Sequence, residues 1–364
     1  MGLQRSGIHK RIALNIVNKI GSRPGRIVLG FMIATGFLSM WISNTATTLM
    51  MLPMALAVIQ GTQNKKLTIP LLLGIAFAAN VGGIGTPIGT PPNLVMMAAY
   101  KDLGFQELSF SDWMRFGLPV TLVMTLVIWL WLARSVSGKD SISLPHSGNW
   151  KKAEVRTLCV FCLTALAWIT RSEPFGGWKT WLDLPEANDA SVAFIAVIFL
   201  FCFPNGEKKG ERLLDWKTAN QIPWGMLILV GAGLCLGEGF KQSGLSESIA
   251  SALSGVENLP ALGVLIGICL LVTFLTEMTS NTATTNLLMP ILGAAAVSAN
   301  LDPKLLMIPA ALSASCAFML PVATIPNAII FGTGQVSVSR MAREGLVLNL
   351  LGVFIITVVV YFCL

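Results

Sequence analysis

Long apolar stretches alternate with short polar loops along almost the whole chain. The apolar stretches cover approximately residues 27–60, 68–99, 116–134, 156–170, 190–203, 222–238, 260–298, 304–333 and 344–363. A helix that spans a bilayer needs about 20 apolar residues, so these stretches predict an all-α polytopic membrane protein. Four stretches do not fit one regular span. Ser-Asn-Thr interrupts 27–60 and 260–298 midway, and Gly and Pro break 68–99 and 304–333.

The four interrupted stretches contain two copies of one sequence unit. Residues 43–53 read SNTATTLMMLP and residues 280–290 read SNTATTNLLMP. A chance identity of six consecutive residues in this chain has odds of roughly one in a thousand. Further along each copy, residues 87–93 read PIGTPPN and residues 321–327 read PVATIPN, at nearly the same spacing. The unit is therefore a hairpin that carries SNTATT, followed by a broken transmembrane helix that carries P-x-x-T-x-P-N.

The number of spans between the two copies predicts their relative orientation. If each SNTATT segment is a re-entrant hairpin, five spans separate the hairpins, and an odd number places them on opposite faces of the membrane. The two copies are then inverted repeats, a recurring plan in transporters. Charge supports this topology, because loops on one predicted side hold thirteen Lys and Arg residues against six on the other. Six more in the N-terminal segment join the richer side, which is predicted to be cytoplasmic.

Composition changes the picture only by excluding other classes of protein. Hydrophobic residues make up 54% of the chain and charged residues 12%, about half the charged fraction of a soluble domain. The net charge of +7 comes from loop residues, which is an orientation signal and predicts no nucleic-acid partner. The only histidines, His9 and His146, lie in polar segments without a metal-like partner set or a nucleophile. An enzyme is therefore not predicted.

The pattern divides the chain into four segments. Residues 1–26 interleave apolar and basic positions and predict an amphipathic helix on the inner membrane surface, with a solvated cytoplasmic helix as the alternative. Residues 27–135 form the first repeat of a transport domain and residues 259–364 form the second. Residues 136–258 between them are expected to form helices and loops of scaffold type.

The composition of the hairpin tips suits a site for an anion and cations. Ser, Asn and Thr begin helices, so each tip ends one helical arm and starts another. The starting arm directs backbone N–H groups and the positive end of its dipole at the site, which favours an anion. The ending arm offers free carbonyls, which favour a hard cation such as sodium. A single motif of this kind is also compatible with a polar contact between membrane helices.

Two further features bear on this site. No Lys or Arg is predicted near the tips, so an anion would be held by Asn and Thr side chains, helix N-termini and bound sodium. Glu277 precedes the second tip within an apolar arm, where a carboxylate is functional by default. Its role is either a structural hydrogen-bond anchor or part of ion coupling.

The paired SNTATT motifs, followed by GTPPN and ATIPN, resemble those of the divalent anion–sodium symporter family of di- and tricarboxylate and sulfate carriers. The resemblance covers essentially the whole chain. It implies a sodium-coupled symporter of dicarboxylates such as succinate, malate or fumarate in the cell (inner or plasma) membrane. It also implies a homodimer in the lipid bilayer, with a scaffold domain and a transport domain that moves like an elevator.

The resemblance also assigns roles to motif residues. One sodium site would use Ser39, Ser43, Asn44 and Gly89, and the other Thr276, Thr279, Asn281 and Ala323, largely through backbone carbonyls. Substrate carboxylates would contact Asn44, Thr45 and Thr90 in the first repeat, and Asn281, Thr282 and Thr324 in the second.

Two departures from the family pattern bear on activity and substrate. Family members usually begin with further membrane helices before the position of Met1, so the chain could also be an inactive N-terminally truncated fragment. Ile325 stands where the family usually has Pro, which affects the second unwound turn and the choice of substrate. The motifs are also compatible with a sodium-independent dicarboxylate exchanger and with a sulfate or citrate carrier.

Overall fold

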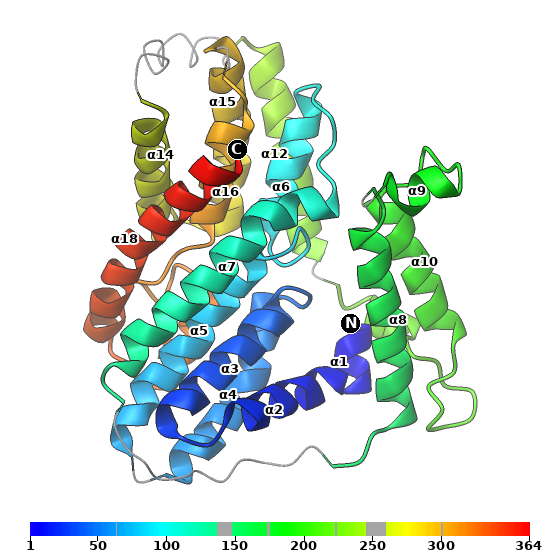
Figure 1. Cartoon of the computed structure of the whole chain (residues 1–364), viewed down its shortest axis with the longest axis vertical. Coiled ribbons are helices and arrows are strands. Elements are labelled where there is room, and N and C mark those ends of the chain that lie inside the picture. The colour runs from blue at the N-terminus through cyan, green and yellow to red at the C-terminus, as the bar shows by residue number, and fades with distance from the viewer. Residues whose placement is uncertain (63, 137–147, 173–174, 223, 245–259, 300) are drawn as a thin grey trace. The chain divides into compact units, whose positions relative to one another are not determined.

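The computed structural model describes the chain except residues 63, 137–147, 173–174, 223, 245–259 and 300. The described residues are predominantly helical (Figure 1). The helices are α1 (Gly2–Ser6), α2 (Ile8–Ile20), α3 (Pro24–Ser39), α4 (Asn44–Gln60), η1 (Lys65–Leu67), α5 (Thr68–Ile84), α6 (Pro91–Asp102), α7 (Phe110–Ala133), α8 (Lys152–Ile169), α9 (Gly177–Trp181), α10 (Asp189–Cys202), α11 (Trp216–Ala219), α12 (Trp224–Gln242), α14 (Ala261–Thr276), α15 (Asn281–Ser298), α16 (Lys304–Ala314), α17 (Ile325–Phe331) and α18 (Val338–Cys363).

The chain folds into two compact units. Unit 1 comprises residues 1–15, 109–113 and 145–224, and unit 2 comprises residues 16–108, 114–144 and 225–364. Unit 2 therefore contains both copies of the repeated sequence, whereas unit 1 contains α8 to α11. Helices α2 and α7 contribute residues to both units.

Unit 2 contains the two predicted hairpins, α3–α4 and α14–α15, and the two predicted broken helices, α5–α6 and α16–α17. In Figure 1 the hairpins open in opposite directions, α3–α4 towards the lower end of the view and α14–α15 towards the upper end. The tip of each hairpin lies at its SNTATT motif. The structure thus confirms the hairpins and the broken helices that the repeated motifs predict.

Local sequence explains where these helices stop and restart. The Ser43 hydroxyl accepts a hydrogen bond from the Ala46 backbone N–H at 3.3 Å and so caps the first turn of α4. Thr324 caps α17 in the same way, through the Asn327 N–H. Between α5 and α6, Pro87 has no N–H to donate and cannot continue a regular helix, whereas Pro91 begins α6 at the first helical position, where no N–H is needed. The chain therefore crosses these breaks as extended or turn backbone.

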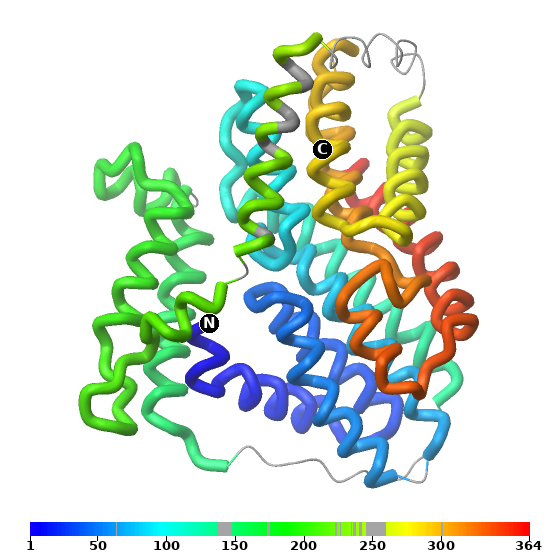
Figure 2. The backbone as a smooth tube through the Cα atoms, turned by 180° about the vertical axis from the view of Figure 1, so that it is seen from behind, coloured from blue at the N-terminus to red at the C-terminus, as the bar shows by residue number. Residues whose placement is uncertain are grey.

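The two repeats pack crosswise on each other in unit 2. The second arm of the first hairpin, α4, packs on α17 of the second repeat, and α15 packs correspondingly on α6 of the first. Helix α5 contacts α3, α4 and α17, and nearly all of its length is buried. Gly82 of α5 lies so close to the Gly36 carbonyl of α3 that a Cβ atom at this position would overlap it. Figure 2 shows these helices from behind. The broken helices therefore form the core of the unit.

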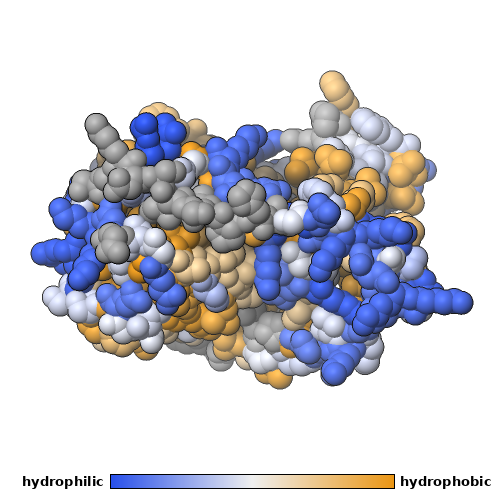
Figure 3. Space-filling view, turned by 90° about the horizontal axis from the view of Figure 1, so that it is seen from below, coloured by the Kyte–Doolittle hydropathy of each residue, from blue (hydrophilic) through white to orange (hydrophobic). Residues whose placement is uncertain are grey.

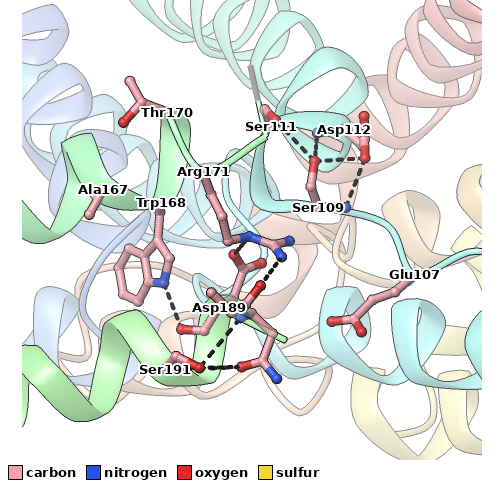
Figure 4. A network of polar contacts seen from close by, with 12 residues as sticks. Glu107, Ser109, Ser111, Asp112, Ala167, Trp168, Thr170, Arg171, Asp189 and Ser191 are labelled. Carbon is pink, nitrogen blue, oxygen red and sulfur yellow. Dashed lines mark hydrogen bonds and ion pairs between the residues drawn. The ribbon is translucent and has the colours of Figure 1, made fainter. Parts of the chain in front are cut away.

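Unit 1 is built around α8 and α10, which lie side by side, with α1 packed on α8. Arg11 and Glu154 form a buried ion pair at 2.8 Å, and Arg11 also donates to the Gly148 and Asn149 carbonyls. A second ion pair joins Arg171 to Asp189 at 2.8 Å, as Figure 4 shows. Removing one partner of the buried Arg11–Glu154 pair costs about 3–5 kcal/mol, because the other charge is left uncompensated. These pairs therefore fix α8 against its neighbours.

The N-terminal segment forms two helices, since the chain turns at Gly7 with φ of 80° before α2 begins. Among the described residues, three longer elements have the length and hydropathy of membrane spans, namely 65–84, α7 and α18. Several shorter helices are also apolar, including α3 and α4 of the first hairpin and α14 of the second. Figure 3 views the end of the molecule at the bottom of Figure 1, where strongly hydrophilic residues stand among hydrophobic ones.

Candidate functional site

The first hairpin tip is held together by the side chains of Ser39 and Asn44. Ser39 is the last residue of α3 and is fully buried. Its hydroxyl hydrogen is shared between Asn44 Oδ1 at 2.7 Å and the Ala79 carbonyl of α5 at 2.7 Å. The Asn44 carbonyl accepts from the Thr48 hydroxyl at 2.8 Å. The tip is thus fixed to the broken helix of its own repeat.

The second tip repeats this arrangement residue for residue. Thr276, fully buried at the end of α14, shares its hydroxyl hydrogen between Asn281 Oδ1 at 2.8 Å and the Ala314 carbonyl of α16 at 2.9 Å. The Thr285 hydroxyl donates to the Asn281 carbonyl at 2.8 Å. Ser39 and Thr276 are therefore matched hydroxyls, and Ala79 and Ala314 are matched acceptors.

The unwound loops after α5 and α16 are matched as well. Asn93 Nδ2 donates to the carbonyls of Gly83 and Thr86 at 2.9 and 2.7 Å. Asn327 Nδ2 makes the corresponding bonds to Ala317 and Leu320, both at 3.1 Å. Each asparagine is the last residue of the P-x-x-T-x-P-N motif, and its two hydrogen bonds hold the two ends of the preceding loop together. Asn93 and Asn327 therefore stabilise the loops that carry the candidate site residues.

In the first repeat, Gly83 brings the tip and the loop together. A Cβ atom at Gly83 would lie 2.8 Å from Asn44 Oδ1 and 3.1 Å from Thr90 Cβ, so only glycine leaves room here. Gly89 approaches the Gly83 carbonyl so closely that a Cβ would overlap it. Three predicted site residues of this repeat, Asn44, Gly89 and Thr90, therefore surround one glycine.

In the second repeat, the predicted site residues fall on the tip and on the following loop. The Thr279 hydroxyl, which is exposed, lies 2.6 Å from Thr284 Oγ1 and donates to the Leu275 carbonyl at 2.9 Å. Ala323 and Thr324 are buried at the end of the unwound loop, with Thr324 beginning α17. Thr282 is also buried, next to Asn281 at the start of α15.

Some predicted residues are not joined directly. Ser43 and Thr45 flank Asn44, and the Thr45 hydroxyl makes no hydrogen bond with any described residue. No hydrogen bond between described residues links Asn44 of one tip to Asn281 of the other. The nitrogen atoms of both amides, Asn44 Nδ2 and Asn281 Nδ2, likewise lack hydrogen-bond acceptors within the described chain. Each tip therefore presents a free amide donor at the positive end of a helix.

Glu277 has a well-defined set of partners. It is 3% exposed, and its carboxylate accepts from the backbone N–H groups of Phe318, Met319 and Leu320 at 2.7, 2.9 and 2.9 Å. Asn349 of α18 donates a fourth hydrogen bond at 2.7 Å. Four donors on one carboxylate support the structural-anchor interpretation of this residue.

In the first repeat, Met40 occupies the position that matches Glu277, and the contact there is different. There the Thr86 hydroxyl donates to the Met40 carbonyl at 2.5 Å, and no carboxylate is present. The two repeats are thus alike in their oxygen sets but differ in charge, which is negative only beside the second tip.

One residue that the motifs do not indicate connects the repeats. Asn80 of α5 is 1% exposed and donates to Thr324 Oγ1 at 3.0 Å and Asn327 Oδ1 at 3.3 Å. A lone asparagine within the apolar run TIPLLLGIAFAANVGG is the signal that could have identified it, because a buried amide in such a helix needs a partner.

The donor set determines what this site can bind. Within the described part of the chain, no group of three His, Cys, Asp or Glu residues is arranged to hold a metal ion. Hydroxyl, amide and carbonyl oxygens of neutral groups dominate both tips, and such oxygens suit a hard cation. The free amides and the N-termini of α4 and α15 suit an anion. The site is therefore equipped for both kinds of ion at once.

Comparisons with known proteins agree with this chemistry. Residues 1–305 match the citrate transporter family. The chain is 40% identical to the sodium-dependent dicarboxylate transporter SdcS of Staphylococcus saprophyticus and 38% identical to that of Staphylococcus aureus. Each alignment covers all of this chain and 74% of the relative.

The fold also has a solved counterpart. The YdaH transporter of Alcanivorax borkumensis superposes with a TM-score of 0.71 over 99% of this chain and 81% of that chain, at 15% identity. At this identity the likeness concerns the fold alone, a helical membrane transporter fold. The family match, the sequence relatives and the paired motifs lead to one assignment: the chain belongs to the divalent anion–sodium symporter family, whose members are membrane transporters and not enzymes.

Proposed function

We propose that this protein is a sodium-coupled symporter of four-carbon dicarboxylates such as succinate, malate or fumarate. The observation that carries the proposal is the pair of free amides, Asn44 Nδ2 and Asn281 Nδ2, each at the start of a helix in a matched tip. Two equivalent donors suit an anion with two similar ends. The names of the relatives, which are sodium-dependent dicarboxylate transporters, support the same conclusion.

Sodium has a physical reason to accompany the anion. The tip and loop segments 39–48, 83–93, 276–286 and 317–327 contain no Lys or Arg. A helix terminus is equivalent to roughly half an elementary charge, so two N-termini offset about one charge of a dianion. Bound sodium offsets the remainder. Sodium is therefore part of the bound state and is carried with the substrate.

The proposed cation sites lie where the first hairpin arms end. Ser39, Ser43, Asn44 and Gly89 would hold one ion, because the end of α3 brings backbone carbonyls to the tip. The Gly36 and Leu38 carbonyls accept N–H groups of the turn, which leaves Ser39 as the terminal carbonyl of this helix for an ion. Thr276, Thr279, Asn281 and Ala323 would hold the other at the end of α14. The dicarboxylate would then contact Asn44, Thr45 and Thr90 with one end, and Asn281, Thr282 and Thr324 with the other.

The domain organisation is part of the proposal. The repeats 27–135 and 259–364 would form the transport domain, residues 136–258 the scaffold, and residues 1–26 an interfacial helix. The protein would act as a multi-pass homodimer in the plasma membrane, with the transport domain moving as an elevator. Both hairpins and both broken helices pack together within unit 2, which supports their movement as one body.

Citrate is a second candidate substrate, because the matched family is described as a citrate transporter. The third carboxylate of citrate would need a further donor beside the two amides. Ile325, in place of the usual Pro, lies next to Thr324 and is exposed, so this position bears on the choice between substrates.

Uptake into proteoliposomes tests the proposal. Labelled succinate, citrate and sulfate would be offered to vesicles loaded with unlabelled substrate, with sodium or choline outside. We expect succinate to be taken up only with sodium, and Asn44→Ala with Asn281→Ala to abolish uptake. Equal uptake in choline would replace symport with sodium-independent exchange, and preferred uptake of citrate or sulfate would change the substrate.

A further inference from the structure

Asn80 reaches from the first repeat into the candidate site of the second. It lies in the buried middle of α5 and is 1% exposed. Its amide nitrogen is 3.0 Å from Thr324 Oγ1, 3.3 Å from Asn327 Oδ1 and 3.4 Å from the Ala317 carbonyl. An amide has two hydrogens, and the shortest of these contacts is the one to Thr324. Thr324 is therefore oriented partly by a residue outside its own repeat.

The hydrogen bonds of Thr324 determine what its hydroxyl can still do. A threonine hydroxyl has two acceptor lone pairs and one hydrogen to donate. Thr324 Oγ1 accepts from Asn80 Nδ2 at 3.0 Å and from the Asn327 backbone N–H at 3.3 Å. Both lone pairs are thus occupied. No residue in the described chain accepts the hydroxyl hydrogen, so Thr324 can donate it to a ligand.

The matched threonine of the first repeat, Thr90, is not oriented in this way. Its hydroxyl makes no hydrogen bond with the described residues and does not cap α6. Ala79 and Ala314 accept corresponding hydrogen bonds, and each is followed by a polar residue, Asn80 in the first repeat and Ser315 in the second. Ser315 is fully buried, and its hydroxyl has no partner among the described residues. Within the described chain, Thr324 therefore has a hydrogen bond from the other repeat and Thr90 has none.

We propose that Asn80 is a positioning residue that fixes the Thr324 hydroxyl as a hydrogen-bond donor to one carboxylate of the substrate. The proposal rests on the function proposed above, in which Thr324 binds substrate. It deepens that function, because it makes the two ends of the site unequal. The end at Thr324 holds its carboxylate with a pre-oriented donor, whereas the end at Thr90 adapts to its ligand.

A double-mutant cycle on succinate binding in sodium tests this role. Thr324→Ala removes a hydrogen bond to a charged group and should raise the Kd for succinate about 10- to 150-fold. Asn80→Ala should raise it about tenfold, because the hydroxyl hydrogen is then free to turn away. The double variant should bind within about threefold of Thr324→Ala alone, since Asn80 acts only through that hydroxyl.

Thr90 and Ser315 supply the controls. In the cycle of Asn80→Ala with Thr90→Ala the two factors should multiply, because Thr90 is not bonded to Asn80. Ser315→Ala should leave the Kd within about twofold of the wild type, since its hydroxyl has no partner within the described chain. If Asn80→Ala does not fold, Asn80→Ser takes its place, because a serine here is as short as the one at position 315.

Each outcome decides between the claims. If the wild type binds succinate in sodium but the factors of Asn80 and Thr324 multiply, Asn80 is merely a structural residue and the inference is overturned. The inference is also overturned if Asn80→Ala shows the same coupling to Thr90→Ala as to Thr324→Ala. If the wild type binds no succinate in sodium, it is the proposed function that fails, and this result is distinct because it appears before any variant is compared.

Discussion

Replacing Glu277 with Gln should loosen the second unwound loop by a predictable amount. The carboxylate accepts four hydrogen bonds, from the N–H groups of Phe318, Met319 and Leu320 and from Asn349. Hydrogen bonds to a charged group contribute about 1.5–3 kcal/mol and those to a neutral group about 1, so three retained bonds lose about 3 kcal/mol together. The glutamine NH2 group takes the place of Oε2, the oxygen that accepts from the Leu320 N–H. Two donors then face each other, which costs about 1–3 kcal/mol more.

Part of this loss is offset, because burying a neutral amide costs several kcal/mol less than burying a charge. The net destabilisation of the loop should therefore be about 2–4 kcal/mol, which corresponds to a roughly 30- to 700-fold rise in the open fraction. Hydrogen–deuterium exchange of peptides covering 315–325 measures this rise directly at the amides concerned. The exposed Glu238→Gln is the matched control and should change nothing. Exchange within threefold of the wild type in Glu277→Gln would refute the anchoring role.

Three other predictions follow from the structure. Asn44→Ala and Asn281→Ala should each abolish succinate binding, because each removes the free amide donor of its tip. The loss of thermal stability should stay modest, about 1 kcal/mol, because the Ser39 and Thr276 hydroxyls lose one acceptor but keep the Ala79 and Ala314 carbonyls. Normal binding by both variants would place the anion elsewhere. Burial lowers the pKa of His9 below its ordinary 6.5. The contribution of His9 to the stability of the folded protein is therefore full above pH 6.5 and falls as acidification protonates the ring. His9→Gln should flatten the dependence of the melting temperature on pH, and an unchanged profile would contradict this role. A cysteine at Lys66 should label only from the cytoplasm and one at Lys179 only from outside, and the reverse pattern would eliminate the hairpin topology.

The architecture of unit 2 was predictable because the sequence contains the same structural unit twice. Identical SNTATT segments inside apolar runs too long for one span require a turn at membrane depth, and the structure has tips at Ser43 and Ser280. Breaks at the Gly- and Pro-rich stretches follow from missing N–H groups and helix propensity. The division at Gly7 was less predictable, because a single glycine in a polar segment gives only a weak helix-stop signal.

The connections inside the site could not be predicted to the same extent. The contacts of Ser39 and Thr276 with a distant helix depend on packing between elements about forty residues apart. Asn80 carries no motif, and its acceptor Thr324 lies in the other repeat. The sequence left two roles open for Glu277, and its four donors became evident only once α18 and the unwound loop were placed around it.

The most direct test of the central claim is the binding of succinate to the purified protein at increasing sodium concentration, with choline and potassium as replacements. Linkage is reciprocal, so each ion should strengthen the binding of the other by the same factor. We predict that the affinity for succinate rises steeply with sodium, that potassium does not substitute, and that Ser39→Ala or Thr276→Ala weakens the dependence. Equal affinity for succinate in sodium and in choline would contradict a site in which bound sodium offsets the charge of the dianion.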